Sequence, residues 1–256
     1  MIDLTLIIPA KNEKDSLPKV LDELKKFNFK KNIILEASDK LTIESIKTYD
    51  CKIIYQDSKG YGDALKKGIE TVDTEFLCIF NADGSFDPKE LDSMIKKIKD
   101  DKNDFVFASR YEKDCGSEDD TFVTFIGNYI FTFLGKIFFK LEITDILYTF
   151  VMARTSSAKK LKLLAKDFSF CVELPIKAKR ANLKIGTSKS YERARIAGKK
   201  KVNALRDGSL ILLILYLVVM ECGLTNQRTD GETFVILSVK QEFKYPTIKL
   251  KKILVN

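Results

Sequence analysis

Short apolar runs alternate with amphipathic stretches through the first 110 residues, and this alternation restricts the possible folds more than any other feature. Each run is rich in β-branched and aromatic residues and ends at polar turn residues, which is typical of a buried strand. The predicted strands are residues 4–8, 32–36, 52–55, 76–80 and 104–108, and the predicted helices are 16–27, 43–49, 60–72 and 88–98. Repeated strand–helix units predict an α/β fold with a mostly parallel central sheet flanked by helices on both faces.

The stretch from Phe76 to Pro88 joins one of these strands to a cluster of polar side chains. Asn81, Asp83 and Ser85 alternate directly after the strand, so their side chains can converge at its carboxyl end, where open parallel sheets bind ligands. The stretch closes with an Asp-Pro pair, which suits the cap and the first residue of a helix. Because an Asp-Gly pair after a strand usually forms only a turn, these residues alone leave a turn and a metal site both open.

The composition limits the chemistry that the chain can perform. It contains no histidine, which excludes imidazole general-base catalysis and histidine-ligated zinc. Its formal net charge of +8 indicates an anionic partner, such as nucleic acid, a phosphorylated substrate or an acidic membrane. With 256 residues, 45% of them hydrophobic, the chain can form one large globular domain, with or without a short appendage.

Cysteine usage and the apolar runs indicate a cellular location. The five cysteines are scattered and form no Cys-x-x-Cys pair, which is typical of reduced thiols in a cytosolic protein. The amino-terminal residues lack a basic leader and a small-residue cleavage site, so we expect no signal peptide. The longest apolar run, Leu210–Met220, has 11 residues. A membrane-spanning helix needs roughly 20, so we expect this run not to span.

The second half of the chain differs from the first in its distribution of aromatic and charged residues. Residues 122–141 are rich in aromatic side chains and carry only two lysines, Lys136 and Lys140, as charges. Further predicted elements are helices at 157–164 and 170–179, a strand at 183–186 and a basic loop at 193–206. Together with Leu210–Met220, residues 122–141 predict amphipathic helices in the carboxyl-terminal half that lie in a membrane interface, although either stretch alone would favour a core helix.

Several motifs follow one another in a characteristic order. They are Ile7-Ile-Pro-Ala-Lys-Asn-Glu13, Gly60-Tyr-Gly-Asp-Ala64, Asn81-Ala-Asp-Gly-Ser-Phe-Asp-Pro88, Ala108-Ser-Arg-Tyr111 and Arg195-Ile-Ala-Gly-Lys-Lys-Lys201 before Asp207-Gly208. In this order the chain resembles family 2 glycosyltransferases with the GT-A fold. The last motif is similar to the R-x-x-G-x-S-K…DG segment of the polyprenyl-phosphate branch, which includes dolichol-phosphate mannosyltransferases. The resemblance predicts a GT-A domain at 1–217 and an appendage of unassigned role at 218–256.

The resemblance implies a binding site for a nucleotide-sugar donor. It places donor-nucleotide contacts at Pro9, Asn12, Glu13, Glu36, Gly60, Gly62, Asn81 and Ala82. Glu36 stands where the family usually has an aspartate, so the geometry of that contact must differ. Glycines that open a helix let backbone N–H groups approach a phosphate closely, although a plain strand-to-helix turn explains Gly60 and Gly62 equally well.

The resemblance also implies a divalent cation, Mg²⁺ or Mn²⁺. The family's D-x-D motif matches Asn81-Ala82-Asp83, with Asp83 on the second aspartate and Ser85 as a further oxygen ligand. A cation held there would act as a Lewis acid on the donor diphosphate, which leaves with negative charge. Asn81 replaces the first carboxylate with a neutral carbonyl, so we expect the site to bind the cation less tightly.

Basic residues are predicted to bind phosphates. In the resembled branch, Arg110, Arg195 and Lys201 match positions in the phosphate clefts, and arginine presents a planar fork to a phosphate group. Lys200 replaces the serine of the family segment, so the sequence has three consecutive lysines there. The alternative is a solvated basic loop or one that touches acidic lipid.

The acceptor decides whether the reaction needs a base. A lipid phosphate is largely ionised at neutral pH and can attack the sugar directly, whereas a sugar hydroxyl must lose its proton to a carboxylate. The candidates for that carboxylate are Asp145 and Glu173, which, with Asp83 and Arg110, complete the predicted catalytic set. Glu173 is explained equally well by a structural role.

These inferences lead to one expected function and two alternatives. We expect transfer of a hexose from a GDP- or UDP-sugar to a polyprenyl phosphate, with inversion, by a cytoplasmic enzyme peripheral to the inner face of the membrane. The first alternative is a family 2 enzyme that glycosylates a saccharide hydroxyl in cell-surface polysaccharide synthesis. The second is a non-catalytic protein that binds a nucleotide sugar or the membrane surface. Nucleic acid is not an expected partner, because no nucleic-acid-binding motif is present.

Overall fold

The computed structural model describes residues 2–198 and 208. Several predicted features therefore lie outside the described residues, namely Lys201, the Leu210–Met220 run and the appendage at 218–256. The domain boundary predicted at residue 217 stays a prediction for the same reason.

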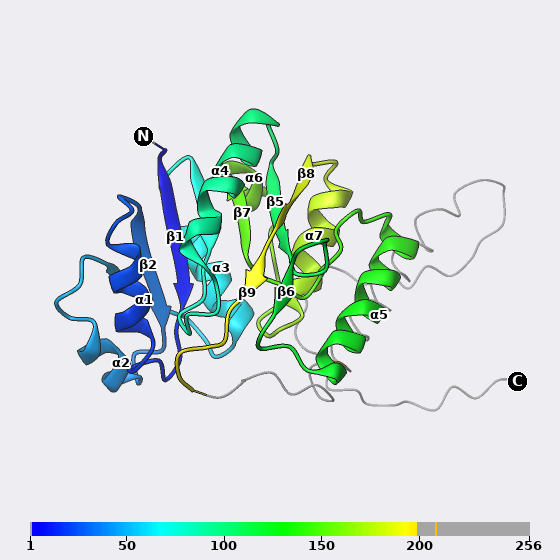
Figure 1. The fold of residues 1–256 in the computed structure, drawn as a ribbon. Coiled ribbons are helices and arrows are strands. Elements are labelled where there is room, and N and C mark those ends of the chain that lie inside the picture. Colours follow the sequence, from blue (N-terminus) through cyan, green and yellow to red (C-terminus); the bar gives the residue numbers. More distant parts are fainter. Residues whose placement is uncertain (1, 199–207, 209–256) are drawn as a thin grey trace, which may run out of the picture.

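A seven-stranded sheet runs through the middle of the molecule in the order β3-β2-β1-β4-β7-β5-β8 (Figure 1). The strands are β1 (Leu4–Pro9), β2 (Lys30–Leu35), β3 (Lys52–Tyr55), β4 (Phe76–Ile79), β5 (Phe105–Ser109), β7 (Val151–Arg154) and β8 (Ile185–Lys189). All neighbours are parallel except β7, which is antiparallel to both β4 and β5. The predicted mostly parallel sheet is confirmed.

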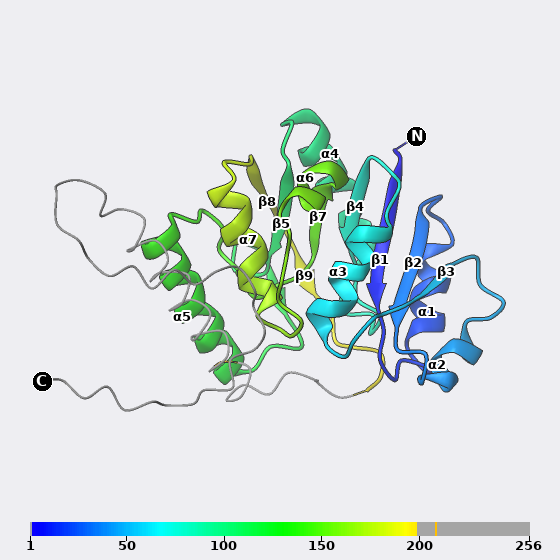
Figure 2. The same cartoon turned by 180° about the vertical axis from the view of Figure 1, so that it is seen from behind.

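Helices cover both faces of the sheet and form a three-layer arrangement. One face is covered by α1 (Leu17–Leu24) and α4 (Leu91–Asp100), and the other by α3 (Tyr61–Thr71), α6 (Thr155–Lys160) and α7 (Phe170–Arg180) (Figures 1 and 2). The short helix α2 (Lys40–Ser45) follows β2, and a single 3₁₀ turn, η1 (Pro88–Glu90), precedes α4. Helices flanking the sheet on both faces are what the strand–helix alternation predicts.

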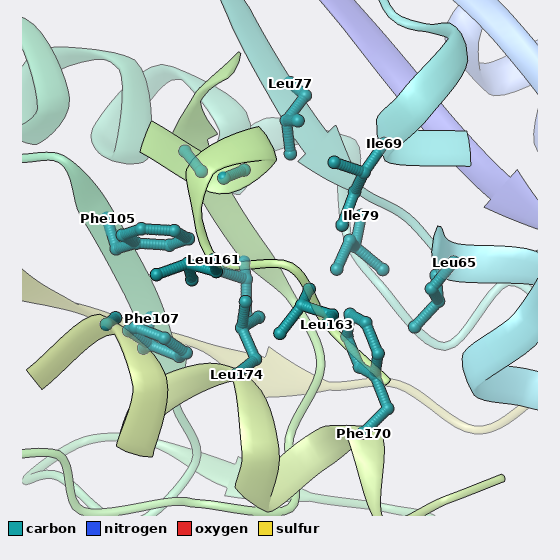
Figure 3. Packing of buried hydrophobic residues seen from close by; sticks show 14 of the residues in the cluster. Leu65, Ile69, Leu77, Ile79, Phe105, Phe107, Leu161, Leu163, Phe170 and Leu174 are labelled. Atoms are coloured by element: carbon teal, nitrogen blue, oxygen red, sulfur yellow. The ribbon is translucent and has the colours of Figure 1, made fainter. Parts of the chain in front are cut away.

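The two faces of the sheet bury two separate apolar layers because successive side chains of a strand point to opposite sides. On β1, Ile7 faces the α3 layer, whereas Leu6 and Ile8 face the α1 layer. Figure 3 shows the α3 layer, in which Phe105 and Phe107 of β5 lie on the same side as Leu161 and Leu174. Strands buried on both faces explain the continuous apolar runs in the sequence.

Some elements differ from the prediction. The strand β7 was not predicted, and a second small sheet pairs β6 (Gly116–Ser117) with β9 (Tyr191–Glu192). The helix predicted at 43–49 begins earlier, because the Asp39 side chain accepts a hydrogen bond from the Thr42 N–H and caps it there. The helix predicted at 157–164 ends at Lys160, and the strand predicted at 183–186 is β8, which begins at Ile185.

The helix α5 (Phe122–Phe139) occupies most of the predicted aromatic stretch and lies beyond α7, at the far end of the molecule from β2 (Figure 1). Its length and apolar composition are sufficient for a membrane-crossing helix, although it packs against α7 on one side. Nine large apolar side chains on its other sides are exposed: Phe122, Val123, Phe125, Ile126, Tyr129, Ile130, Phe133, Ile137 and Phe138. We refer to these nine as the outer face of α5.

Candidate active site

A cleft of about 600 Å³ opens beyond the carboxyl ends of β1, β2, β4 and β5. This is the edge at which open parallel sheets bind ligands, and the volume suits a small-molecule ligand. Nine of the predicted site residues line the cleft: Pro9, Glu13, Glu36, Gly60, Asn81, Ala82, Asp83, Arg110 and Arg195. The predicted residues Asn12, Gly62, Ser85, Asp145 and Glu173 are not part of the lining.

The turn after β4 brings Asn81, Asp83 and Ser85 together, as the alternation predicts. The Asn81 Nδ2 donates a hydrogen bond to the Ser85 Oγ at 3.3 Å, and the Ser85 N–H donates to the Asp83 Oδ1 at 3.0 Å. Gly84 adopts the left-handed conformation that closes this turn, with φ of +84°. Ser85 is fully buried beneath the turn, so of these three side chains only those of Asn81 and Asp83 face the cleft.

These two side chains fit a divalent cation that takes most of its ligands from elsewhere. Because the Asn81 Nδ2 is held by Ser85, the amide is oriented and its carbonyl oxygen is left as the possible ligand. No group of three carboxylate or cysteine side chains within residues 2–198 is close enough to form a complete protein cage. One carboxylate and one carbonyl suit Mg²⁺ or Mn²⁺, which often complete their coordination with substrate phosphates and water.

The turn after β1 forms the adjacent part of the cleft. Glu13 is buried and accepts a hydrogen bond from the Ser16 Oγ at 2.5 Å, while its own N–H donates to the Thr42 Oγ1 at 2.9 Å. Glu36, at the end of β2, lines the cleft and pairs with Lys11 at 3.3 Å. Asn12 has a left-handed backbone, and its N–H donates to Asp39. Asn12 therefore shapes the turn rather than lining the cleft.

Close packing requires glycine at Gly60 and Gly62, which the sequence did not suggest. A β-carbon at Gly60 would lie 2.0 Å from the Lys166 carbonyl oxygen, and one at Gly62 would lie 2.5 Å from that of Ala165. The Asp63 N–H donates to the same Lys166 oxygen at 3.1 Å. The glycines therefore let the loop before α7 pack closely on the start of α3.

Arg110 is the centre of a buried ionic network rather than an open phosphate-binding group. Its Nε and Nη2 donate to the two carboxylate oxygens of Asp145 at 2.7 and 2.9 Å, and its Nη1 donates to Glu192 at 2.7 Å. The guanidinium also lies over the Tyr148 ring, 4.5 Å from its centroid. Burial alone would lower the pKa of Arg110, but the two carboxylates raise it above its ordinary value, so the group stays charged.

The two predicted base candidates are both held by other groups. Asp145 is completely buried, and besides Arg110 it accepts a hydrogen bond from Asn128 of α5 at 2.8 Å. Glu173 accepts hydrogen bonds from the Leu164 and Ala165 N–H groups and pairs with Lys177 at 2.7 Å. Asp145 is thus placed as the partner of Arg110, and Glu173 as an anchor of the loop before α7, rather than as accessible bases.

The structure adds cleft residues that the sequence did not suggest. Asp119, Asp120, Asp167 and Glu192 all line the cleft. Counting these, the described lining has seven carboxylates and only three basic side chains, Lys11, Arg110 and Arg195. No local sequence signal identifies the added acids, because they come from loops that only the tertiary fold brings together. An acidic lining favours cations, so an anionic ligand that enters it needs accompanying positive charge.

Cys171 also lines the cleft, near the start of α7. Burial raises the pKa of its thiol to about 12, so the thiol is protonated at neutral pH. Because the thiolate is the reactive form of cysteine, Cys171 is not placed as a nucleophile.

Comparison with known families and sequences places this geometry in context. Residues 5–162 match the family described as glycosyl transferase family 2. An uncharacterized glycosyltransferase of Mycobacterium bovis is 23% identical over 211 residues, which cover 82% of this chain and 94% of the relative. The UDP-N-acetylglucosamine–dolichyl-phosphate N-acetylglucosaminyltransferase of Methanococcus voltae is 27% identical over 207 residues, covering 71% of this chain and 82% of that protein.

Solved structures with the same architecture include two sugar-phosphoglycerate synthases. Glucosyl-3-phosphoglycerate synthase of Mycobacterium tuberculosis, in complex with Mn²⁺, UDP and glucosyl-3-phosphoglycerate, superposes with a TM-score of 0.67 at 14% identity, covering 87% of this chain and 80% of that one. Mannosyl-3-phosphoglycerate synthase of Rubrobacter xylanophilus gives 0.69 at 12% identity, covering 91% and 79%. At these identities the likeness concerns the fold alone, and it confirms the predicted GT-A fold.

Proposed function

Because the chain belongs to glycosyl transferase family 2 and is a glycosyltransferase, we propose that it transfers a hexose from a nucleoside-diphosphate sugar to a polyprenyl phosphate. A phosphate oxygen of the acceptor attacks C1 of the sugar, the bond from C1 to the donor diphosphate breaks, and the nucleoside diphosphate leaves. Attack opposite the leaving group inverts the anomeric carbon.

The donor half of the proposal is supported by the cleft itself. Pro9, Glu13 and Glu36 line the part formed by β1 and β2, and we assign the nucleoside to that part. The sugar diphosphate then lies over the turn after β4, beside Asn81 and Asp83. Mg²⁺ or Mn²⁺, when bound there, would act as a Lewis acid on the leaving diphosphate. The acidic lining supports this assignment, because a diphosphate needs added positive charge to enter it.

The proposed lipid acceptor is supported by one observation: the helix α5 presents a polar side to the cleft and an apolar side to solvent. Its Thr124 and Asn128 line the cleft, whereas its outer face exposes nine large apolar side chains. A polyprenyl phosphate has the same division, with an ionised head group and a long apolar chain. The head group would lie in the cleft while the chain follows the outer face of α5. A lipid phosphate needs no base, which agrees with the engaged states of Asp145 and Glu173.

The same helix supports a peripheral position on a membrane, and we propose the cytoplasmic face. So many exposed large apolar side chains on one helix are unusual on a water-exposed domain and are typical of interaction with a membrane or another protein. The proposed partner is the membrane, because the lipid acceptor must be reached there and the chain's net charge of +8 favours anionic lipid. Lys136 and Lys140, near the end of α5, would lie at the level of the head groups.

The experiment combines donor, cation and acceptor. Purified protein is assayed with radiolabelled GDP- and UDP-sugars, Mn²⁺ or Mg²⁺, and polyprenyl phosphate in anionic vesicles, and we expect a lipid-linked sugar product. In parallel, Asp83→Ala should abolish the thermal shift that the cation adds in the presence of nucleotide. An unchanged shift in this variant would contradict the cation assignment, and product formation only with free saccharides would contradict the lipid acceptor.

The membrane position has its own test with a matched control. Tyr129→Ser combined with Phe133→Ser removes two exposed rings from the outer face, and it should reduce sedimentation with anionic vesicles at least severalfold. The control is Leu41→Ser, which removes an equally exposed apolar side chain from α2, far from α5 (Figure 1). Equal loss in both variants, or no vesicle binding by the wild type, would contradict the membrane proposal.

The second candidate is transfer to a saccharide hydroxyl, and the acidic lining favours it. Asp167 lines the cleft and accepts hydrogen bonds from Ser169 through Oδ1 only, as far as the described residues show, which leaves Oδ2 able to take a proton. If a hydroxyl is the acceptor, Asp167→Asn should lower kcat at least a hundredfold while donor binding persists. A lipid-phosphate acceptor predicts a much smaller effect of this substitution.

A further inference from the structure

The segment that carries Arg195 is bound directly to the turn that carries Asp83. The Arg193 N–H donates to the Ser85 carbonyl at 2.9 Å, and the Ile196 N–H donates to the Asp83 carbonyl at 2.8 Å. The Ile196 side chain covers Gly84 so closely that a β-carbon at Gly84 would lie 2.4 Å from it. Residues 193–196 therefore lie on the turn as one unit, and the backbone fixes Arg195 above Asp83.

The Arg195 guanidinium joins two carboxylates of the cleft. Its Nη1 lies 3.3 Å from the Asp83 Oδ2, while its Nε and Nη2 bind the two oxygens of Asp119 at 3.2 and 2.8 Å. The other oxygen of Asp83 accepts the Ser85 N–H. Both oxygens of Asp83 are thus engaged, and the hydrogen bond to Asp119 is the main cause that raises the pKa of Arg195.

We propose that Arg195 competes with the divalent cation for the Asp83 carboxylate, and that a diphosphate resolves the competition by drawing Arg195 away from Asp83. This inference rests on the cation assigned to Asp83 in the proposed function. A cation on the Asp83 Oδ2 would face the positive Nη1 at short range, so the two groups disfavour each other there.

Asp119 keeps the Arg195 side chain in the cleft during the proposed change of partner. It holds the Nε and Nη2 edge of the guanidinium, so Arg195 stays in the cleft while Nη1 changes partner from Asp83 to a phosphate oxygen. The phosphate then frees Asp83 for the cation, and the cation favours the same rearrangement. Binding of the diphosphate and binding of the cation are therefore coupled beyond their direct contact, and the coupling acts in both directions. Asp119 is a positioning residue in this scheme, since it acts through Arg195.

The test measures Mn²⁺ binding to the full-length protein by electron paramagnetic resonance of the free ion, without any sugar transfer. Arg195→Gln should bind Mn²⁺ about fivefold more tightly than the wild type, the ratio expected for loss of one partly exposed competing ion pair. Adding UDP or GDP should then tighten Mn²⁺ binding less in Arg195→Gln than in the wild type. Arg195→Met, which keeps the apolar stem, repeats the test should the glutamine variant be less stable.

The matched control is Arg193→Gln, which removes the same charge from the same segment. Arg193 pairs with Glu23 and the Phe86 carbonyl, so its loss should leave Mn²⁺ affinity near that of the wild type. If the Arg195 variants bind Mn²⁺ no more tightly than Arg193→Gln, the competition is overturned while the cation site stands. If no protein binds Mn²⁺, with or without nucleotide, the cation assignment in the proposed function fails, and this inference fails with it.

Discussion

The two walls of the cleft are built in different ways. The first wall is formed by the ends of β1, β2 and β4, and behind it the strands are buried apolar runs. Its ion pair, Lys11 with Glu36, is exposed, with 60% and 20% of the two side chains accessible. The second wall is formed by residues 110–128 and 192–196, and Arg110 in it forms ion pairs with Glu192 and with Asp145 behind the wall, with at most 10% of each side chain accessible. The first wall thus depends on burial of apolar surface, and the second on satisfied buried charge.

The largest expected effect comes from breaking the second wall at its centre. Asp145→Asn leaves the buried Arg110 charge without its main partner, so we expect the free energy of unfolding to fall by about 3–5 kcal/mol. Urea denaturation measures the change, and Glu36→Gln, which breaks the exposed pair of the first wall, should cost at most about 1 kcal/mol. Similar losses in both variants would remove the contrast between the walls.

A smaller effect is expected at Gly60, which lies between β3 and α3, beside the first wall, and contacts the loop before α7. Gly60 has φ of +126°, and a β-carbon there would meet the Lys166 carbonyl at 2.0 Å, so Gly60→Ala should cost about 1–3 kcal/mol of unfolding free energy. The control is Gly127→Ala in α5, where a β-carbon would meet nothing within 4 Å. Alanine in a helix should stabilise there by up to about 1 kcal/mol. If Gly60→Ala were harmless, the close approach of the Lys166 carbonyl to Gly60 would contribute nothing measurable to stability.

Glu90 is a partly buried acid near the second wall, and its surroundings differ from those of Asp145. It accepts hydrogen bonds from Ser190 and Tyr191, yet burial raises its pKa above the ordinary 4.5. The folded chain therefore holds this proton more tightly, and the resulting stabilisation is full below pH 4.5 and is lost as the pH rises through the folded value. Thermal melts should show the stability of the wild type relative to Glu90→Gln falling over that interval. A relative stability that rises with pH would reverse the assigned sign.

The smallest effect on stability is expected on the outer face of α5. Phe133 is about half exposed, so Phe133→Ser should change the free energy of unfolding by no more than about 0.5 kcal/mol. A loss comparable to that of Asp145→Asn would show that another part of the protein covers this face. Urea denaturation of the wild type, Phe133→Ser and Asp145→Asn under the same conditions measures the two losses.

The sequence predicted the first wall better than the second, for a physical reason. Because β1 and β4 are buried on both faces, their sequences are continuous apolar runs. These strands and the turn at Asp83 can therefore be predicted from neighbouring residues alone. The partners of Arg110 are 35 and 82 residues away, and no local pattern joins a loop arginine to such distant acids. The resemblance predicted Arg110, Arg195 and Asp145 as site residues, but it did not predict that Asp145 and Glu192 hold Arg110 or that Asp119 holds Arg195.

The unpredicted strand illustrates the same limit. β7 has only four residues and lies antiparallel between two strands that precede it in the sequence. The alternation of parallel strands and helices predicts no strand at this position, because pattern alone does not reveal an antiparallel insertion into a parallel series. The family and the GT-A fold were confirmed, whereas the catalytic and binding roles of the individual residues stay predictions.

The position of β7 has a consequence for synthesis of the chain on the ribosome. Both sheet neighbours of β5 come later in the sequence than β5 itself, and β4 keeps one unpaired edge until β7 has been made. An unpaired strand edge readily binds strands of other molecules. Translation that stalls before residue 150 should therefore yield aggregates rather than a smaller folded domain.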